Sequence, residues 1–361
     1  MMESARNFSE QHSERLLPNT IAILIAAAFG IFGNFLVILV YSRYVQDKTA
    51  SRFFIPILAF VDLAGCISNV IQYHIDNTMR YPSEILCKIF SFLIILTGGM
   101  SAHLIFAIAL QRYLIICRPF GPQMTTKSCK IATMIICLIS VGYSAPIVKF
   151  SGIHEPSSVT MCHFDDGTNG NSVMIPYFGT FLILSFINII VTSALYIPVI
   201  KTIYKTLSPP KRNRINTIPD DNTIISSKET QDLSSENTGI TMADLPQNIL
   251  RTHNTEPSNT LTTDGNREQR ARRNISVMFL VIITVYVVSY LTSLFTQVYT
   301  FVDPEMDLRG FKLNVYDFCL RFNLLNHIAN PYIYWIFDNK FRNELRLLCC
   351  EKFFRRYSFS L

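Results

Sequence analysis

The chain has 361 residues, of which 49% are hydrophobic and only 16% charged, and its formal net charge is +6. A soluble domain of this length carries more charge and fewer apolar residues, so the composition excludes an ordinary water-soluble protein. The surplus of Lys and Arg lies in the segments between long apolar runs, where it indicates membrane orientation and not nucleic-acid binding.

Seven apolar runs are long enough to cross a bilayer as helices. They cover residues 19–42, 53–76, 86–117, 130–150, 173–204, 273–301 and 312–336. The fourth run is the weakest, because Gly142 and Pro146 interrupt it. The predicted fold is all-α, a seven-transmembrane helix bundle, in which residues 19–205 hold helices 1 to 5 and residues 270–336 hold helices 6 and 7.

The basic residues gather after the odd-numbered runs. The segment after the third run has Arg118, Lys127 and Lys130 and no acid, and the tail after the seventh run is also basic. Because positively charged segments stay in the cytosol, residues 1–18 are predicted to be extracellular and the C-terminus cytosolic. Asn7 opens an Asn-Phe-Ser triplet in the extracellular part, which makes it a candidate glycosylation site.

Two stretches differ from the apolar runs. Residues 206–269 are rich in Ser, Thr, Asn and Asp without apolar periodicity, so they are predicted to form a disordered third cytosolic loop, either phosphorylated or a plain spacer. Residues 337–361 are predicted to form a short amphipathic helix on the inner leaflet and a cytosolic tail, because apolar and basic side chains alternate at helical spacing over residues 339–350. Cys349 and Cys350 near its end are candidates for palmitoylation, or else packing residues.

The third run carries polar side chains along one helical stripe. Cys87, Ser101 and Arg112 fall near this stripe, and the 25 residues from the cysteine to the arginine correspond to about 37 Å of helix. An arginine beside hydrocarbon is costly, so Arg112 must face protein or water and is expected to have a function.

A second set of polar residues lies at mid-depth. A carboxylate at Asp62, in the middle of the second run, must be paired, protonated or bound to a cation. Ser101 lies at the same depth in the third run, and Asn326 and Asn330 share one face of the seventh. This hard-ligand set suits Na⁺ with water, with Asp62 as the metal ligand. The alternative is a hydrogen-bond network without an ion.

The seventh run ends in Asn330-Pro331-Tyr332-Ile333-Tyr334, where the proline kinks the helix and leaves a carbonyl without its helical partner. From about residue 19 to residue 350, the chain resembles the rhodopsin-like (class A) G-protein-coupled receptors. The residues that carry the resemblance are Gly33, Asn34, Leu58, Ala59, Asp62, Cys87, Arg112, Tyr113, Tyr196, Asn330, Pro331 and Tyr334.

The resemblance implies a disulfide between Cys87 and Cys162, which the oxidising secretory pathway permits. It implies a heterotrimeric G protein as the cytosolic partner, contacted by Arg112, Pro119 and Phe120, with arrestin and receptor kinases as further partners. It also implies a multi-pass protein of the plasma membrane that needs no cofactor, apart from an allosteric Na⁺. The expected activation switch comprises Gln111, Arg112, Tyr113, Tyr196, Tyr290, Pro331 and Tyr334.

The chain departs from the family pattern at this switch. Gln111 stands where the family has an acid beside the arginine, Ser289-Tyr290-Leu291-Thr292 replaces a Cys-Trp-x-Pro motif, and Arg272 stands where several receptors place an acid. A neutral amide holds Arg112 less firmly than a carboxylate would. Ligand-free signalling is therefore expected, with less of it in Gln111→Glu.

The expected function is that of a receptor which binds an extracellular ligand and activates a G protein. A transporter or channel is the second possibility, but no internal repeat is visible and Asp62 is the one clear midplane acid. An enzyme is not expected, because no catalytic motif occurs, and His103 and His327 are interpreted as core histidines. An opsin is not expected, because Leu324 stands at the position of the Schiff-base lysine.

The ligand class follows from the outer ends of the helices. Ile94 stands where amine receptors of the family place an aspartate, so an amine is not expected. A mix of aromatic, amide and charged side chains favours a peptide, with Arg321 or Asp317 available for its terminus or a charged side chain. A lipid or non-amine small molecule is the alternative. The candidate ligand residues are Gln72, Tyr73, His74, Ile94, Gln297, Tyr316 and Arg321.

Overall fold

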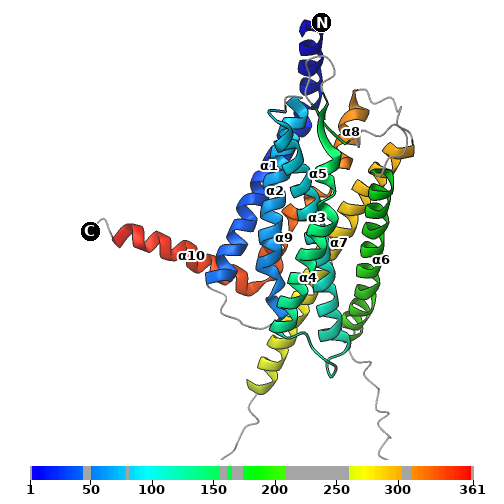
Figure 1. The fold of residues 1–361 in the computed structure, drawn as a ribbon. Coiled ribbons are helices and arrows are strands. Elements are labelled where there is room, and N and C mark those ends of the chain that lie inside the picture. The colour runs from blue at the N-terminus through cyan, green and yellow to red at the C-terminus, as the bar shows by residue number, and fades with distance from the viewer. Residues whose placement is uncertain are drawn as a thin grey trace, which may run out of the picture. The chain divides into compact units, whose positions relative to one another are not determined.

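The structure, a computed structural model, describes residues 2–43, 50–78, 81–154, 161–164, 174–207, 260–302 and 310–358. Residues Met1–Leu207 and Gln269–Leu361 form one unit, a bundle of long helices (Figure 1). The elements are α1 (Met2–Arg43), the 3₁₀ turn η1 (Ala50–Arg52), α2 (Phe54–Thr78), α3 (Glu84–Cys117), α4 (Thr126–Ser144), α5 (Ile147–Phe150), β1 (Ser151–His154), β2 (Met161–Phe164), α6 (Met174–Leu207), α7 (Thr260–Val302), α8 (Phe311–Leu320), α9 (Leu324–Phe337) and α10 (Asn339–Ser358).

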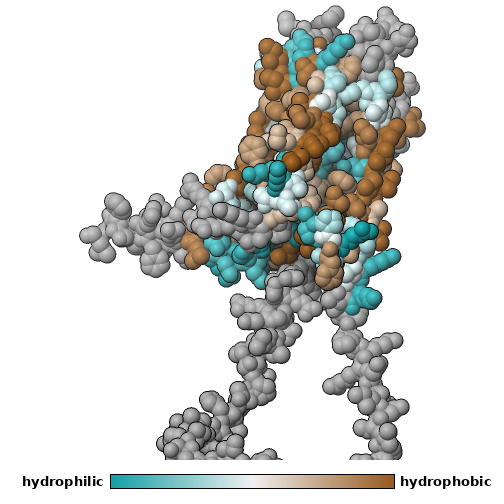
Figure 2. All heavy atoms as spheres, turned by 60° about the horizontal axis from the view of Figure 1, so that its bottom comes forward, coloured by the Kyte–Doolittle hydropathy of each residue, from teal (hydrophilic) through white to brown (hydrophobic). Residues whose placement is uncertain are grey.

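Six of the described helices are long and apolar enough to cross a membrane. Large apolar side chains point outward from them: Phe32 of α1, Leu138 of α4 and Ile190 of α6 are 62%, 70% and 64% exposed. Figure 2 shows hydrophobic side chains along the sides of the helices and hydrophilic ones gathered near the end at which α10 leaves. Exposed apolar surface of this extent requires lipid around it, so the chain is a multi-pass membrane protein.

Polar caps begin the third and fourth helices. Ser83 Oγ accepts a hydrogen bond from the backbone nitrogen of Leu86 at 3.4 Å, and Thr125 Oγ1 accepts one from that of Ser128 at 3.2 Å. The fourth helix stops just before Pro146, which cannot donate a helical hydrogen bond, and the one-turn helix α5 follows. The weakest of the seven apolar runs therefore forms a helix that is broken near its end.

The seventh apolar run forms two helices and not the single span expected over 312–336. α8 stops at Leu320, and α9 resumes after a tight turn in which the Phe322 nitrogen donates to the Cys319 carbonyl at 3.2 Å. Ser293 Oγ of α7 donates to the Leu320 carbonyl at 2.6 Å and so satisfies an acceptor at the end of α8. The two helices together make the seventh crossing.

Three helices extend beyond the segments expected from hydropathy. α7 begins at Thr260, so residues 260–269, which were expected to belong to the disordered third loop, are helical. α1 begins at Met2, within the polar segment 1–18, and Pro18 lies inside it. α10 continues to Ser358, past the amphipathic stretch that predicted it. Polar residues can continue a helix that an apolar run has already started, so the ends of these three helices were not visible in the hydropathy pattern.

Asp338 fixes the junction between α9 and α10. Its carboxylate accepts hydrogen bonds from the backbone nitrogens of Lys340 at 2.9 Å and Phe341 at 3.4 Å, as a helix N-cap does. The same carboxylate accepts from Tyr41 OH at 2.6 Å and pairs with Arg52 at 3.3 Å. α10 is therefore tied to α1 and to the turn η1.

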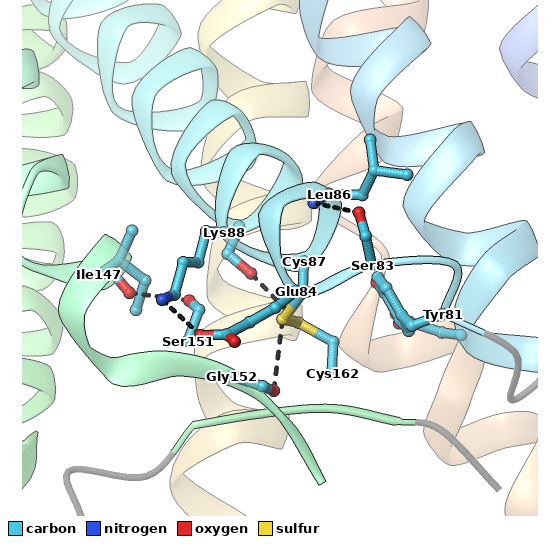
Figure 3. Close-up of a disulfide and its surroundings, with 12 residues drawn as sticks. Tyr81, Ser83, Glu84, Leu86, Cys87, Lys88, Ile147, Ser151, Gly152 and Cys162 are labelled. Atoms are coloured by element: carbon cyan, nitrogen blue, oxygen red, sulfur yellow. Dashed lines mark hydrogen bonds and ion pairs between the residues drawn. A yellow bond between two sulfur atoms is a disulfide. The ribbon is translucent and has the colours of Figure 1, made fainter. Parts of the chain in front are cut away.

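An antiparallel hairpin follows α5, and no sequence pattern had indicated it. β1 pairs with β2, with Ile153 opposite Cys162. A disulfide joins Cys162 to Cys87 in the first turn of α3, with Cα atoms 5.5 Å apart, close to the Ser83 cap (Figure 3). The expected disulfide is therefore present. We call this end of the bundle the disulfide end. The end from which α10 extends is called the α10 end.

Two glycines of α1 let it pack closely against its neighbours. A Cβ at Gly30 would lie 2.7 Å from Cys66 Sγ of α2, and one at Gly33 would lie 2.8 Å from Pro331 Cβ of α9. Both distances are too short for a side chain, so the backbone approach depends on glycine. This packing of α9 against α1 and α2 brings Asp62 to the depth of the polar residues of α9.

Candidate functional site

The polar side chains expected at mid-depth meet in one cluster. Asp62 is fully buried; its Oδ1 accepts a hydrogen bond from Ser101 Oγ at 3.0 Å, and its Oδ2 accepts one from Asn330 Nδ2 at 2.7 Å. Asn326 Nδ2 donates to Ser101 Oγ at 2.9 Å. One buried carboxylate thus connects α2, α3 and α9.

A fifth residue, His327, completes this cluster. Its ring is 1% exposed, and Nδ1 lies 2.8 Å from Asp62 Oδ1. Asn34 of α1 donates to the backbone carbonyl of His327 at 2.8 Å. Gly65 of α2 makes room for the ring, since a Cβ there would lie 3.1 Å from both Cε1 and Nδ1. His327 is buried as expected of a core histidine, but its partner is the carboxylate.

The expected sodium site combined the Asp62 carboxylate with the oxygens of Ser101, Asn326 and Asn330. Among the described residues, His327, Ser101 and Asn330 all approach Asp62 as hydrogen-bond donors, and together they compensate its charge. Asn326 Oδ1 is buried in the same cluster and has no hydrogen-bond partner in the described part of the chain, so one acceptor remains. This donor set does not fit a sodium ion. It agrees with the alternative, a hydrogen-bond network without an ion.

A cavity of about 570 Å³ lies between α3, α4, α6 and α7. Aliphatic side chains and six aromatic rings line it; the aromatic residues are Phe106, Tyr143, Tyr177, Phe181, Tyr286 and Tyr290. Asn188 Oδ1 accepts from Tyr286 OH at 2.6 Å, and Tyr290 OH donates to the Gly98 carbonyl at 2.8 Å. Apart from the ring of His103, the described polar side chains of the lining are amides and hydroxyls. Such a cavity suits an uncharged part of a ligand.

Two of the seven candidate ligand residues, Ile94 and Gln297, line this cavity. The five that do not line it are Gln72, Tyr73, His74, Tyr316 and Arg321. His74 is exposed on α2, and Tyr316 OH shares a hydrogen bond with Thr300 Oγ1 at 2.7 Å. Of the expected ligand set, the structure therefore brings only Ile94 and Gln297 to the described lining of this cavity.

The two charged residues considered for ligand binding, Arg321 and Asp317, pair with other side chains of the protein. Arg321 lies 3.5 Å from Asp76 and 3.5 Å from Asp317, with its guanidinium 4.5 Å from the ring centre of Tyr73. Asp317 also accepts from Tyr73 OH at 2.8 Å and from Asn19 Nδ2 at 3.0 Å. The charges of Arg321 and Asp317 are thus compensated by side chains of neighbouring helices. One of them had been expected to meet a charged group of the ligand, but neither stands free to do so.

Tyr81, between α2 and α3, supports this charged group from outside the helices. Its hydroxyl donates to Asp76 Oδ1 at 2.8 Å. Burial, and after it the nearby Asp76 carboxylate, raises the pKa of the Tyr81 phenol above its ordinary value. The phenol therefore remains a protonated donor throughout the physiological pH range and holds Asp76 in place.

At the α10 end, Arg112 is 5% exposed and its guanidinium lies 4.1 Å from the ring centre of Phe279 in α7. This is a cation–π contact between α3 and α7. Gln111 is turned elsewhere: its Nε2 donates to the Ala50 carbonyl at 2.7 Å and to Cys129 Sγ at 3.6 Å. The side chain of Gln111 therefore holds η1 and α4, and not Arg112 as expected.

The other expected switch and partner residues connect helices or face outward. Tyr196 OH donates to the Ser276 carbonyl of α7 at 2.7 Å, and Tyr334 is fully buried with its ring centre 6.3 Å from that of Tyr41. Tyr113 packs at the edge of the core. Between α3 and α4, Phe120 is fully exposed beside the exposed Pro119.

Some expectations fall outside the described residues. They concern the side chains of Asn7, Arg272, Cys349 and Cys350, and residues 208–259 of the third loop. These expectations therefore stay predictions: glycosylation at Asn7, palmitoylation at Cys349 and Cys350, the place of the Arg272 side chain, and disorder over residues 208–259.

His327, Asp338 and Phe279 are among the residues of these sites that were missed in the sequence. His327 lies three residues before Asn330 on the same helical face, and that spacing could have placed it near Asp62. Asp338 is an acid just before an amphipathic helix, which is a recognisable capping signal. Phe279 gave no signal, because it is one apolar residue within an apolar run.

Long helices that cross a membrane seven times, around an internal cavity and a buried polar network, define a seven-helix membrane protein. The family model described as 7 transmembrane receptor (rhodopsin family) matches residues 33–334. The chain belongs to this family, which is one of receptors and not of enzymes.

The three relatives described next are 23% to 28% identical to this chain over the aligned residues. The Substance-K receptor of Mus musculus is 23% identical over 192 residues, which cover 52% of this chain and 50% of that protein. Melanopsin-A of Danio rerio is 28% identical over 219 residues, covering 59% and 36%. The Tachykinin-like peptides receptor 99D of Drosophila melanogaster is 26% identical over 166 residues, covering 42% and 31%. The chain thus spans at most about half the length of these relatives.

Proposed function

We propose that this protein is a receptor of the plasma membrane which binds an extracellular peptide and activates a heterotrimeric G protein. The excess of Lys and Arg after the odd-numbered runs supports a cytosolic α10 end and an extracellular N-terminus. The observation that carries the proposal is the cavity between α3, α4, α6 and α7, which is large enough to hold part of a ligand.

The lining of the cavity supports a peptide whose inserted part carries no charge. A charged group would lose its hydration there without a counter-charge, and Ile94 offers none. An aromatic side chain or a neutral chain end would meet aromatic rings and the amides of Asn188 and Gln297. The fly relative is named as a receptor for tachykinin-like peptides, which supports a peptide as the ligand class.

Two alternatives have less support. Melanopsin-A is among the relatives, but Leu324 occupies the position of the Schiff-base lysine, so a retinal-linked pigment is not proposed. An apolar cavity would also accept a lipid, yet none of the three relatives above is named for a lipid ligand. Peptide binding is therefore the form of the proposal that we carry forward.

The α10 end supports the contact with a G protein. Phe120 is fully exposed, where a bulky side chain can insert into a partner, and Arg112 lies at the same end of α3. Arrestin and receptor kinases are proposed as further cytosolic partners. We also retain Asn7 as a glycosylation site, and Cys349 with Cys350 as palmitoylation sites, in the proposed topology.

The test is a peptide screen on cells that express the full-length receptor, with calcium and cyclic AMP read together. Each peptide is offered with a free and with an amidated C-terminus, because the cavity disfavours charge. The proposal expects a response from a subset of peptides, absent from untransfected cells, and stronger for the amidated form when that end enters the cavity. If the receptor responds to lipids but to no peptide, the proposal of a peptide ligand is contradicted.

With an active peptide in hand, Asn188→Ala is expected to lower potency about fivefold. The variant removes an amide from the cavity lining, and one neutral hydrogen bond contributes about 1 kcal/mol. The half-maximal concentration is measured at matched surface expression. Ser193→Ala is the control, because its hydroxyl donates within α6, to the Ile189 carbonyl, and Ser193 is not part of the described cavity lining. Equal potencies for the two variants would show that Asn188 does not contact the peptide.

A further inference from the structure

The Asp62 carboxylate is held by three donors within the bundle. Nδ1 of His327 lies 2.8 Å from Oδ1, and Ser101 Oγ donates to the same oxygen at 3.0 Å. Asn330 Nδ2 donates to Oδ2 at 2.7 Å. Carboxylate oxygens accept hydrogen bonds, so the tautomer of His327 with a hydrogen on Nδ1 satisfies this contact. The imidazole thus serves as a third donor to Asp62.

We propose that His327 takes the place that a sodium ion would hold beside Asp62, so that this receptor does not respond to sodium. Na⁺ is a hard cation that binds oxygen lone pairs. Oδ1 of Asp62 already accepts two hydrogen bonds, and the imidazole stands against it. The link between α2 and α9 is therefore made by a side chain of the protein and not by an exchangeable ion.

The ring is held in this position from two sides. Asn34 of α1 fixes the His327 backbone by donating to its carbonyl at 2.8 Å. On the other side, the ring lies so close to α2 that a Cβ added at Gly65 would be 3.1 Å from Nδ1. Because backbone and ring are both constrained, the imidazole cannot move away from Asp62 without a rearrangement of the helices.

The inference makes a gain-of-function variant possible. His327→Ser would remove the ring and leave a hydroxyl oxygen near Asp62 and Ser101. Asn326 Oδ1, which is buried without a partner among the described residues, is a further oxygen of the same cluster. Carboxylate, hydroxyl and amide oxygens together form a ligand set that suits a small hard cation. A sodium response is therefore expected in the variant and not in the natural protein.

The test uses the purified full-length receptor without any ligand. Its melting temperature is measured in sodium chloride and in choline chloride at equal ionic strength. The natural protein should melt within about 1 °C in the two salts, whereas sodium should raise the melting temperature of His327→Ser by about 2–4 °C. The double variant His327→Ser/Asp62→Asn is the matched control and should lose the sodium response.

Two results would overturn the inference. A sodium-dependent rise in the natural protein would show that the ion binds beside His327. A folded His327→Ser variant without a sodium response would show that the ring is not what replaces the ion. If His327→Ser does not fold, His327→Asn removes the ring while keeping an amide, and the comparison of salts on the natural protein stands on its own. Since no peptide or G protein is involved, failure here leaves the proposed receptor function unaffected.

Discussion

Serine in place of either Cys87 or Cys162 is expected to remove most of the receptor from the cell surface. The disulfide joins residues 75 positions apart, and closing a loop of this length stabilises a fold by about 2–4 kcal/mol. That is a large fraction of the roughly 5–15 kcal/mol that keeps a protein folded. The hairpin it anchors has only four paired positions, so its strands alone contribute little.

The measurement is surface receptor counted through an N-terminal tag in intact cells, with peptide binding as a second readout. Cys87→Ser, Cys162→Ser and the double variant should lose the same amount, since each removes the same bond. Cys137→Ser is the control, because this cysteine is free and exposed on α4, and it should behave as the natural protein does. A double variant with the summed loss of both single variants would show two cysteines acting separately.

Hydropathy predicted the membrane crossings because each crossing must keep one face in lipid, which requires a long apolar run whatever its neighbours are. The break in the fourth helix could be predicted in part, since Pro146 acts locally on the backbone. The break after Leu320 could not be predicted, because it involves a contact with a distant segment. Ser293 Oγ of α7 donates a hydrogen bond to the Leu320 carbonyl. A contact between distant segments leaves no trace in the pattern of either one.

The same distinction applies to the sites. Asp62 could be identified because it is an acid in the middle of an apolar run, and Ser101 because it lies at the same depth in the third run. Their partners depend on how α9 packs against α2, so His327 was interpreted as a core residue. Gln111 was expected to face Arg112, as an acid would. An amide can donate as well as accept, and this one donates to the Ala50 carbonyl, where a carboxylate could not.

Phe279→Leu is expected to raise ligand-free signalling about 2-fold to 30-fold. The guanidinium of Arg112 lies 4.1 Å from the centre of the Phe279 ring, and this contact joins α3 to α7 at the end proposed to bind the G protein. Leucine keeps the site apolar but removes the ring, and a cation–π contact is worth about 0.5 kcal/mol when exposed and about 2 when desolvated. An equilibrium between a held and a released arginine shifts tenfold for about 1.4 kcal/mol.

Basal signalling is measured in cells without added peptide and divided by surface receptor. Phe279→Tyr keeps an aromatic face under Arg112, so its basal signal should stay close to that of the natural protein. In the Gln111→Glu variant, the side chain can no longer donate a hydrogen bond to the Ala50 carbonyl. The new carboxylate would lie next to that carbonyl oxygen. We therefore expect this variant to lower surface expression, and not the basal signal per receptor. If Phe279→Leu and Phe279→Tyr signal equally at matched expression, the ring does not restrain Arg112, and the restraint must come from another contact of the arginine.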